Sequence, residues 1–169
     1  MKRSAGSLLV AGFDYKNPSI ERLIHLLKYD FIEDIAPILA ELLFNFFIEQ
    51  HLQSLFIVTA VPLHAKKYHA RGFNQSHLIA KTFSHYAGIE YIETLTRFYN
   101  TKSQTELLRE ERLTNVAGVF SAHALEYIQQ KNIILIDDVL TTGATMQEAA
   151  TTLLQAGARR VIGLAVAHG

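Results

Sequence analysis

The chain contains no cysteine among its 169 residues. Disulfides, cysteine-ligated zinc and thiol catalysis are therefore excluded, and the absence fits a cytoplasmic protein. The chain also has no excess of positive or negative charge, because 16 Lys and Arg residues balance 16 Asp and Glu residues. This balance argues against a broad nucleic-acid footprint, although it leaves room for a local basic patch.

Long apolar runs are also missing. The longest apolar segment, residues 35–48, is interrupted by Glu41 and Asn45, which makes it too short and too polar to span a bilayer. The apolar stretch near the start is short as well, so we expect neither a secretory signal nor membrane insertion. No G-x-x-x-x-G-K-[ST] sequence occurs, which argues against a Walker-type nucleotide site.

Helical and strand patterns alternate along the chain. Asn17-Pro18 is typical of a helix start, with Asn as the cap and Pro in the first turn. The alternation predicts an α/β fold with a parallel sheet and right-handed crossovers, in a single domain over residues 1–169. Its N-terminal part, residues 1–52, is expected to be helical, and residues 53–169 to form the core. We expect helices from Asn17 and at 32–50, 74–86 and 144–155, a loop at 63–73, and strands at 55–61, 89–92, 116–120, 133–136 and 160–166.

The segment from Ile133 to Thr145 is the most informative part of the chain. An apolar strand is followed by two carboxylates, then by a turn with hydroxyls and a glycine, then by a helix. Ligands of open α/β sheets gather at the C-terminal ends of the strands, where Asp137 and Asp138 can accept hydrogen bonds from vicinal hydroxyls. Backbone N–H groups at the start of a helix favour an anion, and Gly143 lets a phosphate approach the backbone closely.

This order of elements predicts a binding site for a sugar phosphate. The alternative is a Rossmann-like strand end whose Asp-Asp pair only caps the next helix.

A second signal follows the strand expected at 55–61. Lys66, Lys67 and Arg71 precede a helix start and should emerge at the same sheet edge as Asp137. Cations there are suited to phosphate groups, and the guanidinium of Arg71 to bidentate contact with one. The alternative is a solvated basic loop.

The segment at 133–145 resembles the phosphoribosyl pyrophosphate (PRPP) binding motif of type I phosphoribosyltransferases, and the chain from about 10 to 167 resembles the ComF-type phosphoribosyltransferase-like proteins. The sequence R-G-F-N-Q at 71–75, at this distance from V-P-L-H at 61–64, distinguishes the ComF-type proteins from other phosphoribosyltransferases. Many members begin with a four-cysteine zinc ribbon, which this chain does not contain. The matching pieces are Leu23 to Tyr29, Val61 to His64, Arg71 to Gln75, Gln104-Thr105, Glu111 to Val116, and the 133–145 motif.

The resemblance implies a type I phosphoribosyltransferase-like parallel sheet flanked by helices, with an N-terminal helical subdomain and a PRPP-binding core. Asp137, Asp138 and Arg71 are then the catalytic candidates. Mg²⁺ is expected with PRPP near the two acids, without a protein cage, and no zinc is expected. The residues implied to bind the ribose and the 5′-phosphate are Asp137, Asp138, Val139, Leu140, Thr141, Thr142, Gly143, Ala144 and Thr145. Those implied to bind the pyrophosphate are Pro62, Leu63, Lys66, Lys67 and Arg71.

The resemblance also implies a loop that closes over the ligand, with Lys102, Gln104 and Arg109. The alternative for that segment is an exposed charged helix.

By the same resemblance the protein transfers a phosphoribosyl group to an unidentified acceptor, releases pyrophosphate and is linked to DNA uptake in natural transformation. The alternative is a module without catalysis that senses PRPP or a nucleotide, or that handles single-stranded DNA. Its basic loop would meet phosphates, and Tyr68 and Phe73 would stack on bases. An adaptor for a competence helicase, docking through residues 17–50, and a homodimer are also left open.

Overall fold

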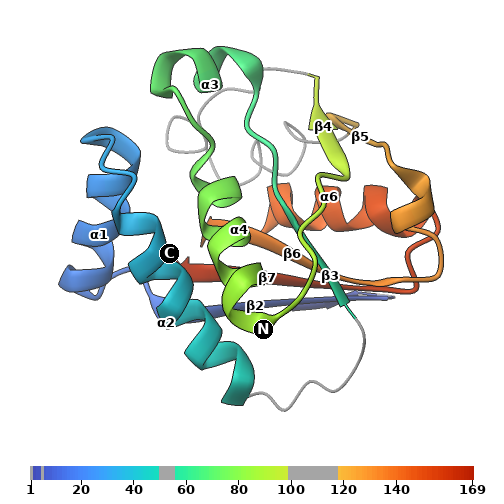
Figure 1. The fold of residues 1–169 in the computed structure, drawn as a ribbon, viewed down its shortest axis with the longest axis horizontal. Helices are drawn as coiled ribbons and strands as arrows, with labels where there is room; N and C mark the ends of the chain where they lie inside the picture. Colours follow the sequence, from blue (N-terminus) through green and yellow to red (C-terminus); the bar gives the residue numbers. More distant parts are fainter. Residues whose placement is uncertain (1, 5, 50–55, 99–117) are drawn as a thin grey trace.

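The computed structural model describes residues 2–4, 6–49, 56–98 and 118–169. A five-stranded sheet in the order β1-β2-β7-β6-β3 forms its centre (Figure 1). Strands β2, β7, β6 and β3 are parallel, and β1 runs antiparallel to β2 at the edge. The predicted α/β fold, with a parallel sheet flanked by helices, is confirmed. The strands of this sheet are β1 (Lys2–Ser4), β2 (Ser7–Asp14), β3 (Phe56–Ala60), β6 (Asn132–Leu140) and β7 (Arg160–His168).

Helices cover both faces of this sheet. On one face α1, α2 and α4 form one apolar cluster with Ile134 and Ile136 of β6, and α2 lies beside α4 (Figure 1). On the other face α6 packs against Ile133 and Leu135. A small antiparallel sheet of β4 and β5 adjoins the α6 face. The remaining elements are α1 (Pro18–Tyr29), α2 (Ile35–Glu49), α3 (Ala65–Arg71), α4 (Gln75–Ala87), β4 (Leu95–Arg97), β5 (Phe120–Ala122), the 3₁₀ helix η2 (Leu125–Tyr127) and α6 (Ala144–Gln155).

Local sequence explains the main elements. The side chain of Asn17 accepts hydrogen bonds from the backbone N–H groups of Ser19 and Ile20, so the predicted helix start is confirmed. The four apolar residues from Ile133 to Ile136 are all 0% exposed, as expected for a parallel strand buried on both faces. Helix α2 is not buried along its whole apolar sequence, because Ile38 is 45% exposed.

Four predictions about secondary structure were wrong or incomplete. No strand was expected before residue 55, yet β2 lies within the sheet and pairs Leu9 with Gly163 of β7. Its short apolar run gains a partner only from the far end of the chain. The segment at 63–73 was expected to be a loop, but it contains α3, which has no buried residue and therefore shows no apolar periodicity.

The other two differences concern the predicted short strands. Residues 89–92 form no strand beyond an isolated bridge between Val58 and Tyr91. The strand predicted at 116–120 shares only Phe120 with β5, and residues 116 and 117 lie outside the described part. Within the described residues, every helix is too short or too polar to cross a membrane.

Candidate functional site

A cavity of about 610 Å³ opens where the parallel strands end. Its lining includes the residue that follows each of these strands: Tyr15 after β2, Val61 after β3, Thr141 after β6 and Gly169 after β7. Parallel strands present their C-terminal ends at one edge of a sheet, so the topology brings these distant segments together.

The acidic pair lies in the last part of β6, which continues to Leu140. The Oδ1 atom of Asp137 accepts hydrogen bonds from Ser76 Oγ at 2.7 Å and from the backbone N–H of Asp138 at 2.9 Å. The Oδ1 atom of Asp138 lies 2.9 Å from Nζ of Lys28 in α1. Among the described residues, no hydrogen-bond partner reaches Oδ2 of Asp138, although that atom is buried.

This packing raises the pKa of Asp137 and that of Lys28, but for different reasons. Burial, and then repulsion by Asp138, raise the pKa of Asp137 to about 7, against the opposing effects of Ser76 and Lys28. Burial opposes the charge of Lys28, but attraction by Asp138 and then Asp137 outweighs it and raises the pKa of Lys28. Near neutral pH the pair can therefore donate as well as accept hydrogen bonds.

The loop after the acidic pair leads into α6. Thr141, Gly143 and Thr145 line the cavity, as do Val139 and Leu140. Gly143 is buried with a φ of 81° and caps α6, a left-handed conformation that glycine adopts without steric cost. The start of α6 thus brings backbone N–H groups to the cavity, an arrangement that favours an anion.

Two residues of the predicted loop do not line the cavity, namely Thr142 and Ala144. The hydroxyl of Thr142 instead accepts a hydrogen bond from the backbone N–H of Ala144 at 3.3 Å, which shapes the turn.

The basic segment after β3 contributes part of its predicted set. Pro62, Leu63, Lys67 and Arg71 line the cavity, whereas Lys66 is exposed on α3 and does not. The guanidinium of Arg71 donates a hydrogen bond to the side chain of Gln75 and lies over the ring of Tyr29, 6.0 Å from its centroid.

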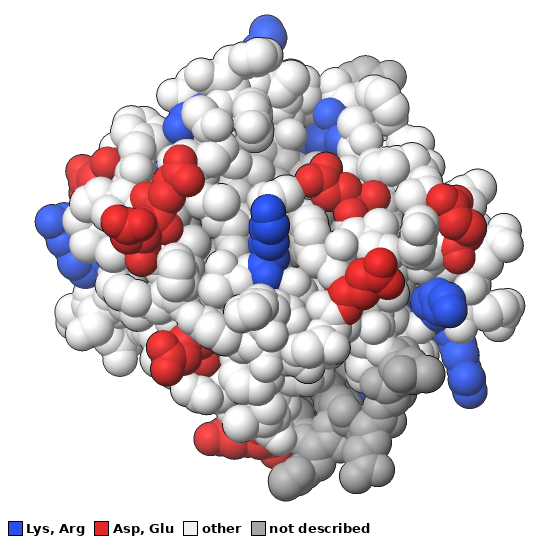
Figure 2. Space-filling model, in the orientation of Figure 1, with Lys and Arg blue, Asp and Glu red and all other residues white. Residues whose placement is uncertain are grey.

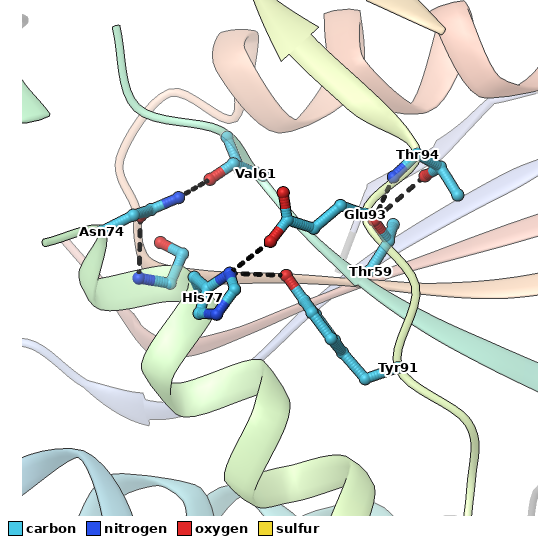
Figure 3. Close-up of polar contacts among 8 residues, drawn as sticks. Thr59, Val61, Asn74, His77, Tyr91, Glu93 and Thr94 are labelled. Atoms are coloured by element: carbon cyan, nitrogen blue, oxygen red, sulfur yellow. Dashed lines mark hydrogen bonds and ion pairs between the residues drawn. The ribbon is translucent and has the colours of Figure 1, made fainter. Parts of the chain in front are cut away.

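Asn74 fixes the start of α4 to the end of β3. Its side chain donates a hydrogen bond to the carbonyl of Val61 at 3.1 Å and accepts one from the backbone N–H of Ser76 (Figure 3). The clamp places Ser76 against the acidic pair. Phe73, proposed for base stacking in the alternative reading, is buried at 7% exposure, so it cannot stack on a base. Tyr68 remains 47% exposed.

A second set of contacts ties residues 91–94 to β3 and α4. His77 Nδ1 lies 2.9 Å from the hydroxyl of Tyr91 and 3.1 Å from a carboxylate oxygen of Glu93 (Figure 3). The hydroxyl of Thr94 donates to that of Thr59 at 3.0 Å. These contacts anchor the chain just before β4, from which Arg97 reaches the cavity. Burial lowers the pKa of Arg97, against the attraction of Asp137.

Sequence reasoning missed several residues at the cavity. Lys28 and Tyr29 stand in the Leu23 to Tyr29 run that resembles the family, which was the available signal, but no role followed from it. Ser76 directly follows the R-G-F-N-Q sequence. Tyr15 and Arg97 had no local signal, since only the fold brings them near. The missed lining residues are Tyr15, Lys28, Tyr29, Phe31, Val61, Ala70, Asn74, Gln75, Ser76, Arg97, Met146 and Gly169.

The predicted closing loop cannot be placed. Lys102, Gln104 and Arg109 lie outside the described residues. Within the described part of the chain, no group of three or more His, Asp or Glu side chains could hold a metal ion. Figure 2 shows acidic and basic side chains interspersed over one face, with no continuous field of one sign.

Comparisons with known proteins identify the family and the fold of this chain. The phosphoribosyl transferase domain family matches residues 72–169. The chain is also similar to a solved structure, that of the allosteric regulatory enzyme of purine biosynthesis, with 20% identity and a TM-score of 0.52 over 78% of this chain. It spans only 26% of that enzyme chain, and the likeness shows the fold alone.

Curated relatives are similar over more of their length. DNA utilization protein YhgH of Salmonella typhimurium is 34% identical over 158 residues, which make up 90% of this chain and 68% of that protein. Competence protein ComFC of Bacillus subtilis is 35% identical over 102 residues, 60% of this chain and 40% of that protein. The chain therefore belongs to the ComF family and carries a phosphoribosyl transferase domain.

Proposed function

We propose that this protein binds PRPP with Mg²⁺ and transfers its phosphoribosyl group to an acceptor with release of pyrophosphate. The observation that carries the proposal is a single cavity in which the acidic pair, the start of α6 and the basic segment after β3 meet. A sugar with vicinal hydroxyls and phosphates at both ends matches these three surfaces. The names of the relatives point to the use of DNA and to competence as the setting.

The roles follow from the positions of the residues. Asp137 and Asp138 hold the ribose hydroxyls, and the turn from Thr141 to Thr145 binds the 5′-phosphate. Lys67 and Arg71 face the pyrophosphate, whose leaving charge they stabilise. The chain thus contributes positioning and charge stabilisation to displacement at C1′, without a covalent intermediate.

Magnesium fits this arrangement as a ligand-borne ion. The two adjacent carboxylates offer few protein ligands, and Mg²⁺ is commonly held by phosphate oxygens and water with one or two carboxylates. Bound with PRPP, the ion would neutralise part of the pyrophosphate charge. Asp137 and Asp138 are the residues that would face it.

A thermal shift measurement tests the proposal. A ligand at about 100 times its dissociation constant stabilises a protein by about 2.7 kcal/mol. For a domain of this size, the midpoint should rise by about 5–10 °C with PRPP and Mg²⁺. The Asp137→Asn, Asp138→Asn double variant is the matched control and should show a smaller shift.

A screen for pyrophosphate release over nucleobases and amines then identifies the acceptor. A folded protein without any shift at millimolar PRPP would rule out the binding claim. A shift without pyrophosphate release for any acceptor would support a sensor in place of a transferase.

A further inference from the structure

Lys28 is a largely buried cation that the proposed function leaves without a role. It lies in the last turn of α1, and its side chain is 17% exposed, next to that of Asp138 at 6%. Lysine is rarely buried unless its charge is paired. Here the partner is one of the two carboxylates on which the proposed ribose site depends.

The contact closes Asp138 to a ligand. Its Oδ1 atom lies 2.9 Å from the ammonium, and its Oδ2 atom is buried without a hydrogen-bond partner among the described residues. A ribose hydroxyl must reach one of these oxygens to donate a hydrogen bond. The ammonium therefore has to leave, or to give up part of its contact, before the sugar can bind.

Two features of the Lys28–Asp138 ion pair favour its opening by a ligand. A buried acceptor without a partner carries a desolvation penalty, which an incoming hydroxyl donor would remove. The ammonium of lysine is a compact charge on a flexible stem, so it can withdraw from a carboxylate without moving the backbone. The cavity next to this ion pair is lined by Lys28 and Asp138 themselves, so the stem has space to move into.

We propose that Lys28 is an internal lock on the acidic pair, which a ligand opens by replacing the ammonium with its own hydroxyl donors. The inference rests on the proposed function, because it takes the acidic pair to be the ribose site. Binding of the sugar then requires displacement of the Lys28 ammonium, which α1 holds at the acidic pair. A ligand with a phosphate but no suitably placed hydroxyls leaves the Lys28–Asp138 ion pair intact.

The test compares Lys28→Met with the parent protein by titration calorimetry. The ligands are ribose 5-phosphate, PRPP with Mg²⁺, and pyrophosphate. We expect the variant to bind ribose 5-phosphate about tenfold more tightly, the ratio that corresponds to ~1.4 kcal/mol, while pyrophosphate affinity stays the same. Lys28→Arg keeps a charged donor at Asp138 and should remain near the parent. Lys81→Met, an exposed lysine on α4, is the matched control.

The outcomes separate the lock from the function. If the parent binds PRPP and Lys28→Met binds the ribose ligands equally or more weakly, Lys28 is no lock and the proposed function stands. If neither protein binds PRPP or ribose 5-phosphate, both proposals fail. If only Lys28→Met binds them, the lock is established in its strongest form.

A measurement on the parent protein covers the case in which Lys28→Met does not fold. Lysine ammonium groups labelled with ¹⁵N are observed by NMR, with the Lys28 signal assigned from Lys28→Arg. A buried, paired ammonium exchanges its protons slowly, so its signal should be visible without ligand. Saturation with ribose 5-phosphate should accelerate that exchange and remove the signal. A signal that stays protected in the complex would overturn the lock.

Discussion

Asp137 and Asp138 are neighbours in β6 with different partners. Asp138 is paired with a cation, whereas Asp137 accepts hydrogen bonds from a hydroxyl and from the backbone. Because a hydroxyl neutralises no charge, burial and the adjacent carboxylate determine the behaviour of Asp137, and its pKa rises to about 7.

This raised pKa predicts an unusual dependence of stability on pH. An unfolded aspartic acid has a pKa of about 3.9, so between that value and about 7 the folded protein binds the proton more tightly than the unfolded chain does. The free energy of unfolding attributed to Asp137 should therefore fall as pH rises through this range. Asp137→Asn removes the titrating group, and its stability relative to the parent should increase by about 1.4 kcal/mol per pH unit between about pH 4 and about pH 7, on the order of 4 kcal/mol in all.

Urea denaturation of both proteins across this pH range measures the difference. Asp34→Asn, on the exposed segment before α2, serves as the control for a change of net charge. A constant difference in stability between parent and Asp137→Asn would show that the pKa of Asp137 is close to its usual value.

Gly143 is the second residue with a sharp expectation. Its φ of 81° is unfavourable for a β-branched side chain, and it caps the helix whose start lines the cavity. Gly143→Val should weaken the binding of ribose 5-phosphate and PRPP together, by about tenfold or more. Calorimetry with both ligands and pyrophosphate checks this. Loss of pyrophosphate binding alone would place the loop at the other end of the ligand.

At the scale of elements, the cations of α3 differ in whether they reach the cavity. Arg71, at its end, lines the cavity and contacts Gln75 and Tyr29, while Lys66 is exposed near its start. Charge-assisted hydrogen bonds contribute roughly 1.5–3 kcal/mol, whereas exposed ammonium groups are screened by salt. Arg71→Ala should therefore weaken pyrophosphate and PRPP binding by about tenfold or more and spare ribose 5-phosphate, and Lys66→Ala should change each affinity much less.

Titration of the two variants with all three ligands tests this separation. Equal losses of ribose 5-phosphate and pyrophosphate binding in Arg71→Ala would indicate that α3 is misplaced or that the variant is misfolded. An equal effect of Lys66→Ala and Arg71→Ala would mean that the lysine turns toward the ligand on binding.

The elements also show what sequence could predict. The acidic pair and the glycine turn are contiguous, so their chemistry is visible in one short segment, and the helix caps at Asn17 and Asn74 depend only on neighbouring residues. Lys28 and Arg97 are different. Each acquires its place from the packing of an element far away in the chain, which no local pattern records.

For the molecule as a whole, the close packing of the layers depends on Gly163 in β7. A Cβ there would meet the side chains of Met146 in α6 and Leu9 in β2 well inside van der Waals contact. Overpacking of this kind costs about 1–3 kcal/mol, so Gly163→Ala should lower the thermal midpoint by about 3–10 °C. Gly12→Ala in β2 is the matched control, because the nearest atom to its Cβ would lie 3.4 Å away.

Calorimetric melting of both variants provides the measurement. A Gly163→Ala protein as stable as Gly12→Ala would show that Met146 and Leu9 rearrange without cost. The sheet would then be less tightly covered by α6 than its geometry indicates.

The sheet order has a consequence for synthesis of the chain. Strand β2 emerges from the ribosome well before its parallel partner β7, because β3 and β6 of the same sheet lie between them in the sequence. Until then β2 has no neighbour on that side, and an unpaired strand edge is prone to association with other chains. Slow translation should thus prolong the exposure of β2, whereas chaperones that bind nascent chains should increase the yield of native protein.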